Sequence, residues 1–141
     1  MIDIFIKFLA GCLGAWCYGY LFKAPPRILF PGAIAGGVSF SCVYILGNYP
    51  IWGTALGAFC VGCIAYNLAP RMKVPVTPLI TPGIITIVPG ISAYNAFMAA
   101  ISGDYLGGLT GLVNVGAYTV AIAVGLSAAE FFFHSFLRRR L

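Results

Sequence analysis

The sequence predicts an all-α integral membrane protein with five transmembrane helices, the fourth of them broken by proline and glycine. Of the 141 residues, 61% are hydrophobic and only 8% are charged, whereas a soluble domain carries about 25% charged residues. Apolar runs of about 20 residues, the length that crosses a bilayer, follow one another along the chain. Of the eight basic residues, all but Lys7 lie in the gaps between these runs or in the C-terminal tail.

The expected spans form one transmembrane domain that covers residues 1–141. They run over residues 2–22, 29–47, 51–69, 75–101 and 108–134. The first ends before Pro25-Pro26, and the second closes at Gly47-Asn48-Tyr49-Pro50, which is a strong turn signal. The third ends at Pro70, where a basic loop begins. The polar loop Ser102–Asp104 separates the fourth span from the fifth, and the arginine tail follows the fifth.

The charge distribution predicts the topology. Five crossings place the loops at 23–28 and 70–74 on the same side as the tail, which contains Arg138, Arg139 and Arg140. A re-entrant hairpin over 75–101 would move that tail to the opposite side. The positive-inside rule therefore favours a single crossing, with the N-terminus outside and the C-terminus in the cytoplasm.

These features indicate a multi-pass protein of the plasma (inner) membrane, in contact with membrane lipid. No basic patch has interleaved aromatic residues for base stacking, so no nucleic-acid partner is expected. Small residues recur at packing distance in Gly11-x3-Ala15, Gly32-x3-Gly36, Gly53-x3-Gly57 and Gly107-x3-Gly111. Such pairs let membrane helices approach closely, so we expect a tightly packed bundle.

The most informative segment is 74–95, VPVTPLITPGIITIVPGISAYN. Pro78, Pro82 and Pro89 each remove a helical hydrogen bond, although every backbone polar group in hydrocarbon needs a partner. On a continuous helix, Pro78 and Pro82 would lie about 40° apart and Pro82 and Pro89 about 20° apart, so that the carbonyls freed four residues earlier would also align. The segment is either a structural kink or a binding site, and the two Pro-Gly pairs favour a site.

Neutral polar side chains accompany the prolines of this segment. They are Thr77, Thr81, Thr86, Ser92 and Asn95. A zwitterionic or carboxylate solute would meet freed N–H groups where a half-helix starts and freed carbonyls where the preceding half-helix ends.

Acidic residues are scarce, so few side chains are available to move a proton. Asp104, in a short loop, and Glu130, about two turns before the arginine tail, are the candidates for proton coupling. Glu130 has an alternative, interfacial role in which it pairs with an arginine or with His134. No catalytic motif is present, so neither an enzyme, a metal site nor a cofactor is expected. The five cysteines, Cys60-x-x-Cys63 included, are predicted to pack between helices.

Several strings resemble the threonine/serine exporter family, in particular its small membrane subunit or C-terminal half. They are Pro78-Leu-Ile-Thr-Pro82-Gly83, Ile87-Val-Pro89-Gly90, Tyr94 and Asp104-Tyr-Leu-Gly-Gly108. The resemblance implies a secondary transporter that exports small amino acids such as threonine and serine, or small dicarboxylates in related two-subunit forms. It also implies a larger membrane subunit as the partner.

The first hypothesis is therefore an exporter subunit whose solute site lies at the broken helix 77–95 and is shared with a partner subunit. The expected substrate-binding residues are Thr77, Thr81, Pro82, Gly83, Pro89, Gly90, Tyr94 and Asn95. One alternative is a non-transporting membrane scaffold or assembly protein, in which the broken span only kinks and no cavity lies near residues 77–95. Another is a small homo-oligomeric channel.

Overall fold

A computed structural model describes residues 2–137, which are helical apart from short connections. The six helices are α1 (Ile2–Leu21), α2 (Pro26–Ile45), α3 (Pro50–Met72), α4 (Thr77–Ile85), α5 (Gly90–Ile101) and α6 (Tyr105–Leu137). The arginines at 138–140, on which the topology prediction partly rests, lie outside the described residues.

Four of these helices, α1, α2, α3 and α6, are long and apolar enough to cross a membrane. Helices α4 and α5 pass the same test only as a pair, and they are bent by 58° at the break between them. The described residues thus contain four candidate spans, or five if the bent pair is one span. The all-α fold and the break in the fourth predicted span are confirmed, and the other predicted boundaries differ from the helix ends by a few residues.

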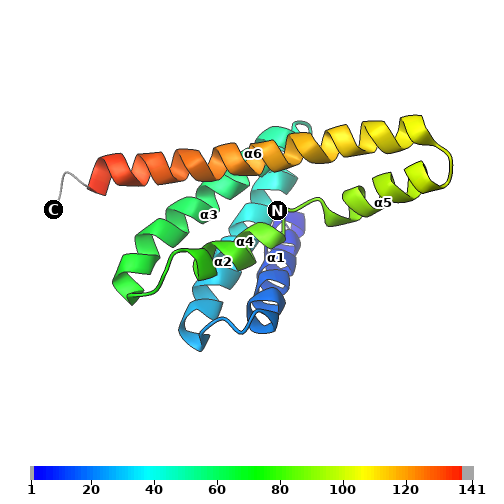
Figure 1. Cartoon of the computed structure of the whole chain (residues 1–141). Coiled ribbons are helices and arrows are strands. Elements are labelled where there is room, and N and C mark those ends of the chain that lie inside the picture. Colours follow the sequence, from blue (N-terminus) through cyan, green and yellow to red (C-terminus); the bar gives the residue numbers. More distant parts are fainter. Residues whose placement is uncertain (1, 138–141) are drawn as a thin grey trace.

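Helices α1 to α4 form a bundle from which a helical hairpin projects (Figure 1). We call this hairpin, residues 90–116, the arm. It consists of α5 and the first part of α6, which pack on each other, while the later part of α6 crosses α3. Helix α4 lies within the bundle and contacts α1, α2 and α3.

Glycine allows the bundle helices to approach closely, as the small-residue pairs predict. A Cβ added at Gly11 would lie 2.7 Å from the Gly36 carbonyl oxygen, and one added at Gly57 would lie 2.9 Å from the Ser39 carbonyl oxygen. Side chains at these positions would force the helices apart, because backbone atoms cannot move out of the way as a flexible side chain can. The predicted close packing is confirmed.

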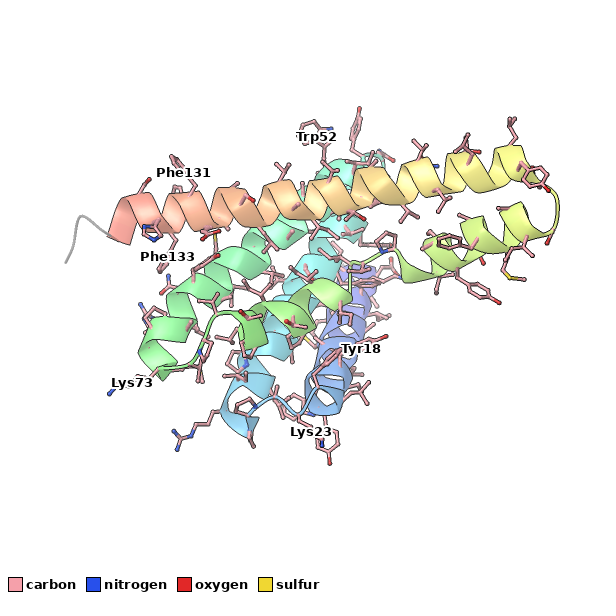
Figure 2. The ribbon with its side chains drawn as sticks, viewed as in Figure 1. Tyr18, Lys23, Trp52, Lys73, Phe131 and Phe133 are labelled. Carbon is pink, nitrogen blue, oxygen red and sulfur yellow. The ribbon has the colours of Figure 1, made fainter. Side chains whose placement is uncertain are left out.

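Two relationships bear on the direction in which the chain crosses the membrane. Gly125 lies against Ala55 and Gly62 lies against Ala129, so α3 and α6 run in the same direction. A re-entrant hairpin between the two helices would instead make them antiparallel. Figure 2 shows Lys23 and Lys73 at one end of the bundle and Trp52 at the opposite end.

Candidate functional site

The site is built around the break between α4 and α5. The amides of Ile87 and Val88 both donate to the Ile84 carbonyl, at 2.9 and 3.2 Å, which ends α4. Pro89 has no amide with which to continue the helix, and it lies directly before α5. The predicted stripe of three aligned prolines is therefore wrong, because Pro78 and Pro82 belong to α4 whereas Pro89 follows the bend.

One backbone carbonyl at the break is bound by side chains in place of an amide. Because the Ile87 amide donates to Ile84, the Gly83 carbonyl accepts from Thr86 Oγ1 at 2.8 Å and from Ser39 Oγ at 3.0 Å. Ser39 is fully buried in α2, and its Oγ lies 3.1 Å from Thr86 Oγ1 and 2.9 Å from the Gly36 carbonyl oxygen, so its one hydrogen is shared between Gly36 and Gly83. The sequence predicts freed carbonyls only four residues before each proline, and Ser39 is not among the predicted site residues.

Helix α4 packs against glycines of α1 and α2. The Pro82 ring lies 3.6 Å from the positions that Cβ atoms on Gly19 and Gly32 would occupy. The Thr86 methyl group lies 3.4 Å from the corresponding position on Gly36. The Pro82 face of α4 and the adjoining Thr86 thus lie on glycines of α1 and α2. Leu79 of α4, by contrast, is buried against Ile28 of α2 and Ala65 of α3.

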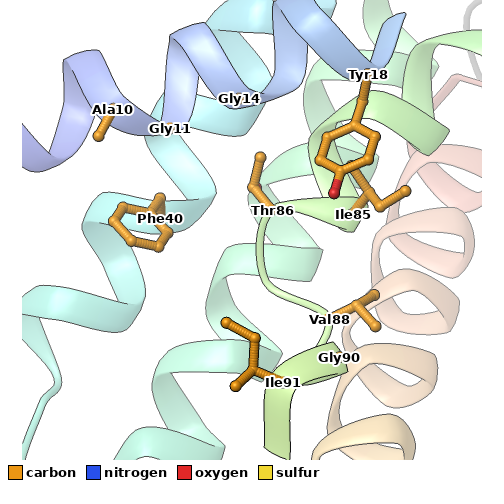
Figure 3. Close-up of a pocket in the computed structure, with 10 residues that line it drawn as sticks. All are labelled: Ala10, Gly11, Gly14, Tyr18, Phe40, Ile85, Thr86, Val88, Gly90 and Ile91. Carbon is orange, nitrogen blue, oxygen red and sulfur yellow. The ribbon is translucent and has the colours of Figure 1, made fainter. Parts of the chain in front are cut away.

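Two cavities lie at the two ends of α4. The first, of about 280 Å³, is lined by Phe22, Lys23, Ala24, Pro25, Thr77, Pro78, Thr81 and Pro82, and we call it the Lys23 cavity. The second, of about 370 Å³, is lined by Ala10, Gly11, Gly14, Tyr18, Phe40, Ile85, Thr86, Val88, Gly90 and Ile91 (Figure 3), and we call it the Tyr18 cavity. Between them, Pro82 packs on Gly19 and Gly32.

Each cavity combines apolar walls with a few polar groups. In the Tyr18 cavity, Tyr18 reaches from α1 towards Ile85 and Thr86 (Figure 3). Tyr18 is not among the residues predicted from sequence, because a tyrosine near the end of a span is typical of the membrane interface. In the Lys23 cavity, Thr81 Oγ1 donates to the Thr77 carbonyl at 2.9 Å, and Lys23 supplies a positive charge. The position of Lys23 beside α4 follows from tertiary packing, for which the sequence had no signal.

The structure brings half of the predicted substrate-binding residues to these cavities. Thr77, Thr81 and Pro82 line the Lys23 cavity, and Gly90 lines the Tyr18 cavity. The other four are distributed differently: Gly83 packs on Val61, Pro89 lies at the bend, and Tyr94 and Asn95 are exposed on the arm.

The two candidates for proton coupling lie away from both cavities. Asp104 Oδ1 accepts from the Gly107 amide at 2.9 Å, which caps the start of α6. Glu130 is exposed, and its carboxylate lies beside the phenol of Tyr66. Within residues 2–137, Glu130 forms no ion pair with His134. Proton coupling by Asp104 or Glu130 stays a prediction.

Residues 7–132 match the family described as "Threonine/Serine exporter, ThrE". A similar protein, the probable threonine/serine exporter of Mycobacterium tuberculosis (strain ATCC 25618 / H37Rv), is 26% identical over 137 residues. The match covers 92% of this chain, which spans only 25% of that relative's length. No solved structure matches the chain significantly.

Proposed function

Because the chain belongs to the threonine/serine exporter family, we propose that it is a subunit of a secondary transporter that exports small polar metabolites. The solutes are threonine- or serine-like amino acids or small dicarboxylates, and a larger membrane subunit of the same family supplies the rest of the exporter. The family match and the four to five apolar helices identify a multi-pass membrane protein, consistent with the plasma membrane. They also point to transport rather than catalysis.

The observation that most supports a solute site at the broken helix is the pair of cavities at the two ends of α4. A secondary transporter must expose its site to one side of the membrane at a time. In the proposal, the path follows α4 and is closed where Pro82 packs on Gly19 and Gly32. Movement of α4 about the break would open this contact, because hinges lie at the ends of helices.

The polar groups of the cavities suit a solute with a carboxylate. Lys23 provides a positive charge at one end of α4. Gly90 and Ile91, in the first turn of α5, line the Tyr18 cavity, and the positive end of a helix dipole favours an anionic group. The hydroxyls of Thr81 and Tyr18 add neutral hydrogen-bonding groups for an amino or hydroxyl substituent.

In the proposed topology, α4 and α5 cross the membrane once, with the N-terminus outside and the C-terminus in the cytoplasm. The parallel run of α3 and α6 supports one crossing between them. Lys23 and Lys73 lie at the same end of the bundle (Figure 2), as expected for two cytoplasmic loops. The solute would then enter the Lys23 cavity from the cytoplasm.

The scaffold alternative predicts no cavity near residues 77–95, whereas residues of this segment line two cavities. The geometry therefore favours the transport proposal over a kink that only shapes the bundle. A homo-oligomeric channel has no comparable support.

The test is efflux of labelled threonine, serine or succinate from cells that express the chain with its partner. Replacing Pro82 with Ala and Pro89-Gly90 with Ala-Leu should abolish efflux while the protein still folds and inserts. Pro70→Ala is the matched control, because Pro70 also lies inside a helix, α3, but lines neither cavity. Unchanged efflux in the folded double replacement would refute the proposal.

A further inference from the structure

We infer that the arm, around Asn95 and Asn114, is the docking surface for the larger membrane subunit. This inference rests on the proposed function, because it assigns the place where the exporter's two parts meet. The arm projects from the bundle, and α5 packs mainly on α6 (Figure 1). Much of its surface is thus exposed in the chain alone, including Tyr94 and Val113, each 64% exposed.

Three exposed hydroxyls of the arm and the adjoining part of α6 bond back to their own helices, whereas the exposed Ser92 on α5 has no such bond among residues 2–137. Ser102 Oγ donates to the Met98 carbonyl, Thr110 Oγ1 to the Leu106 carbonyl and Thr119 Oγ1 to the Val115 carbonyl. Such bonds satisfy a hydroxyl that faces lipid.

The two amides of the arm lack such bonds. Asn95 and Asn114 are exposed, and among residues 2–137 neither side chain has a hydrogen-bond partner. A carboxamide has two donor hydrogens and an acceptor oxygen, and lipid tails can satisfy neither. Protein or enclosed water must therefore meet these groups if they lie at membrane depth.

In the proposed topology the loop at Asp104 lies at the membrane surface, which puts both amides at membrane depth. Ala96 packs on Gly111 and Ala100 packs on Gly108, so Asn95 and Asn114 lie at nearly the same level along the two antiparallel helices. Asn114 is ten residues from Asp104 at the tip of the arm, which is about 15 Å of helix. That distance is about half the thickness of the hydrocarbon core.

The irregular backbone at the break next to the arm must also be shielded from lipid. Val88 is 48% exposed, and a Cβ added at Gly90 would find no atom within 4 Å. Irregular backbone does not face lipid at membrane depth. A partner that covers Asn95 would lie beside this break and the Tyr18 cavity, so the solute site would be shared between the two subunits.

The larger subunit fits this surface better than a second copy of the chain does. The chain spans 25% of the length of its exporter relative, so three quarters of that protein has no counterpart here. A second copy of this chain would repeat the shared segment and would supply none of that remaining length. The predicted partner presents membrane helices with hydrogen-bonding side chains or freed backbone groups at the depth of the two amides.

Site-specific photocrosslinking in the intact membrane tests the surface. p-Benzoylphenylalanine replaces Tyr94 or Val113 on the arm and, as controls of matched exposure, Leu13 (67%) on α1 or Phe30 (65%) on α2. We expect the two arm positions to yield an adduct with an exporter-family membrane protein, identified by mass spectrometry, and the two controls to yield none. Three outcomes would overturn the inference. They are adducts with lipid only, an adduct of twice the chain's mass, and equal yields at all four positions.

Amide-to-leucine variants supply a second measurement. Asn114→Leu and Asn95→Leu should each lower the recovery of the partner with the purified chain at least fivefold. The melting temperature of the chain alone should stay the same or rise, because leucine suits lipid. Asn67→Leu is the control, since Asn67 is exposed near the end of α3 and away from the arm. Unchanged partner recovery would overturn the inference. Because crosslinking does not depend on efflux, the docking surface can be tested even if the proposed exporter function is refuted. Efflux can likewise be tested if the docking surface is refuted.

Discussion

The Ser39 hydroxyl lies 3.0 Å from the Gly83 carbonyl, so a fully buried side chain of α2 holds the last turn of α4 across 44 residues of sequence. The same hydroxyl lies 3.1 Å from Thr86 Oγ1, which also donates to Gly83. These three groups connect the bundle to the residues directly before the break. They therefore set the position from which α4 would move in the proposed transport cycle.

Replacing Ser39 with alanine should alter transport more than stability. The Gly83 carbonyl keeps its bond from Thr86, and side-chain hydrogen bonds between membrane helices contribute only about 0.6 kcal/mol on average. We expect a small drop in melting temperature in detergent and at least a threefold change in efflux rate. Ser41→Ala is the control, because Ser41 Oγ bonds only within α2, to the Gly37 carbonyl. Equal efflux in the two variants would contradict a role for Ser39 at α4.

Gly83→Ala should destabilise the protein through a steric clash with α3. The added Cβ would lie 2.8 Å from Cγ1 and 3.1 Å from Cγ2 of Val61, a residue with no exposed surface. Overpacking of this kind typically costs about 1–3 kcal/mol. The second variant, Val61→Ala, removes both clashing methyl groups, so the double variant should recover part of the loss. Thermal unfolding in detergent measures all three proteins, and strictly additive losses would show that the two sites do not interact.

The fold was largely predictable because its determinants are local. Length and hydropathy defined the helices, and the Pro-Gly pairs at Pro82 and Pro89 located the broken segment. The three prolines do not form one stripe because the helix is broken: the bonds to the Ile84 carbonyl end α4 before Pro89. These hydrogen bonds form only when the chain bends. A local sequence pattern therefore does not predict the residue at which α4 ends.

The cavities were not predictable, since they depend on which helices are neighbours. Ser39 is one hydroxyl within an apolar span, and it becomes notable only when Gly83 lies next to it. Tyr18 and Lys23 are typical of a membrane interface by sequence, yet packing of α1 on α4 brings both to a cavity. Among the predicted residues on α4, Thr77, Thr81 and Pro82 line a cavity, whereas Gly83 packs on Val61 of α3.

Thr81→Val should weaken solute binding if the Lys23 cavity receives the solute. Valine keeps the shape of threonine and removes the hydroxyl, and one neutral hydrogen bond contributes about 0.5–1.5 kcal/mol. The Michaelis constant for efflux should therefore rise roughly two- to tenfold. Thr119→Val is a matched control, because Thr119 also bonds back to its own helix at 2.9 Å but lies on an exposed face of α6. A similar rise in both variants would point to a general effect of losing a back-bonded hydroxyl.

Lys23→Gln should selectively weaken transport of solutes that have a carboxylate. Lys23 and Lys73 follow α1 and α3 with nearly the same left-handed backbone, at φ values of 53° and 54°, but only Lys23 lines a cavity beside α4. Lys73→Gln therefore controls for both backbone strain and loss of a loop charge. We expect the Michaelis constant to rise about fivefold for Lys23→Gln, a modest effect because the side chain is exposed and its charge is screened.

The salt dependence of this effect separates charge from shape. High ionic strength should raise the Michaelis constant of the unmodified protein towards that of Lys23→Gln, while the variant itself should change little. Lys23→Arg, which keeps the charge, should retain most of the affinity. If Lys23→Gln and Lys73→Gln were equally impaired, the lysines would act through insertion or topology, under the positive-inside rule, and not through contact with the solute.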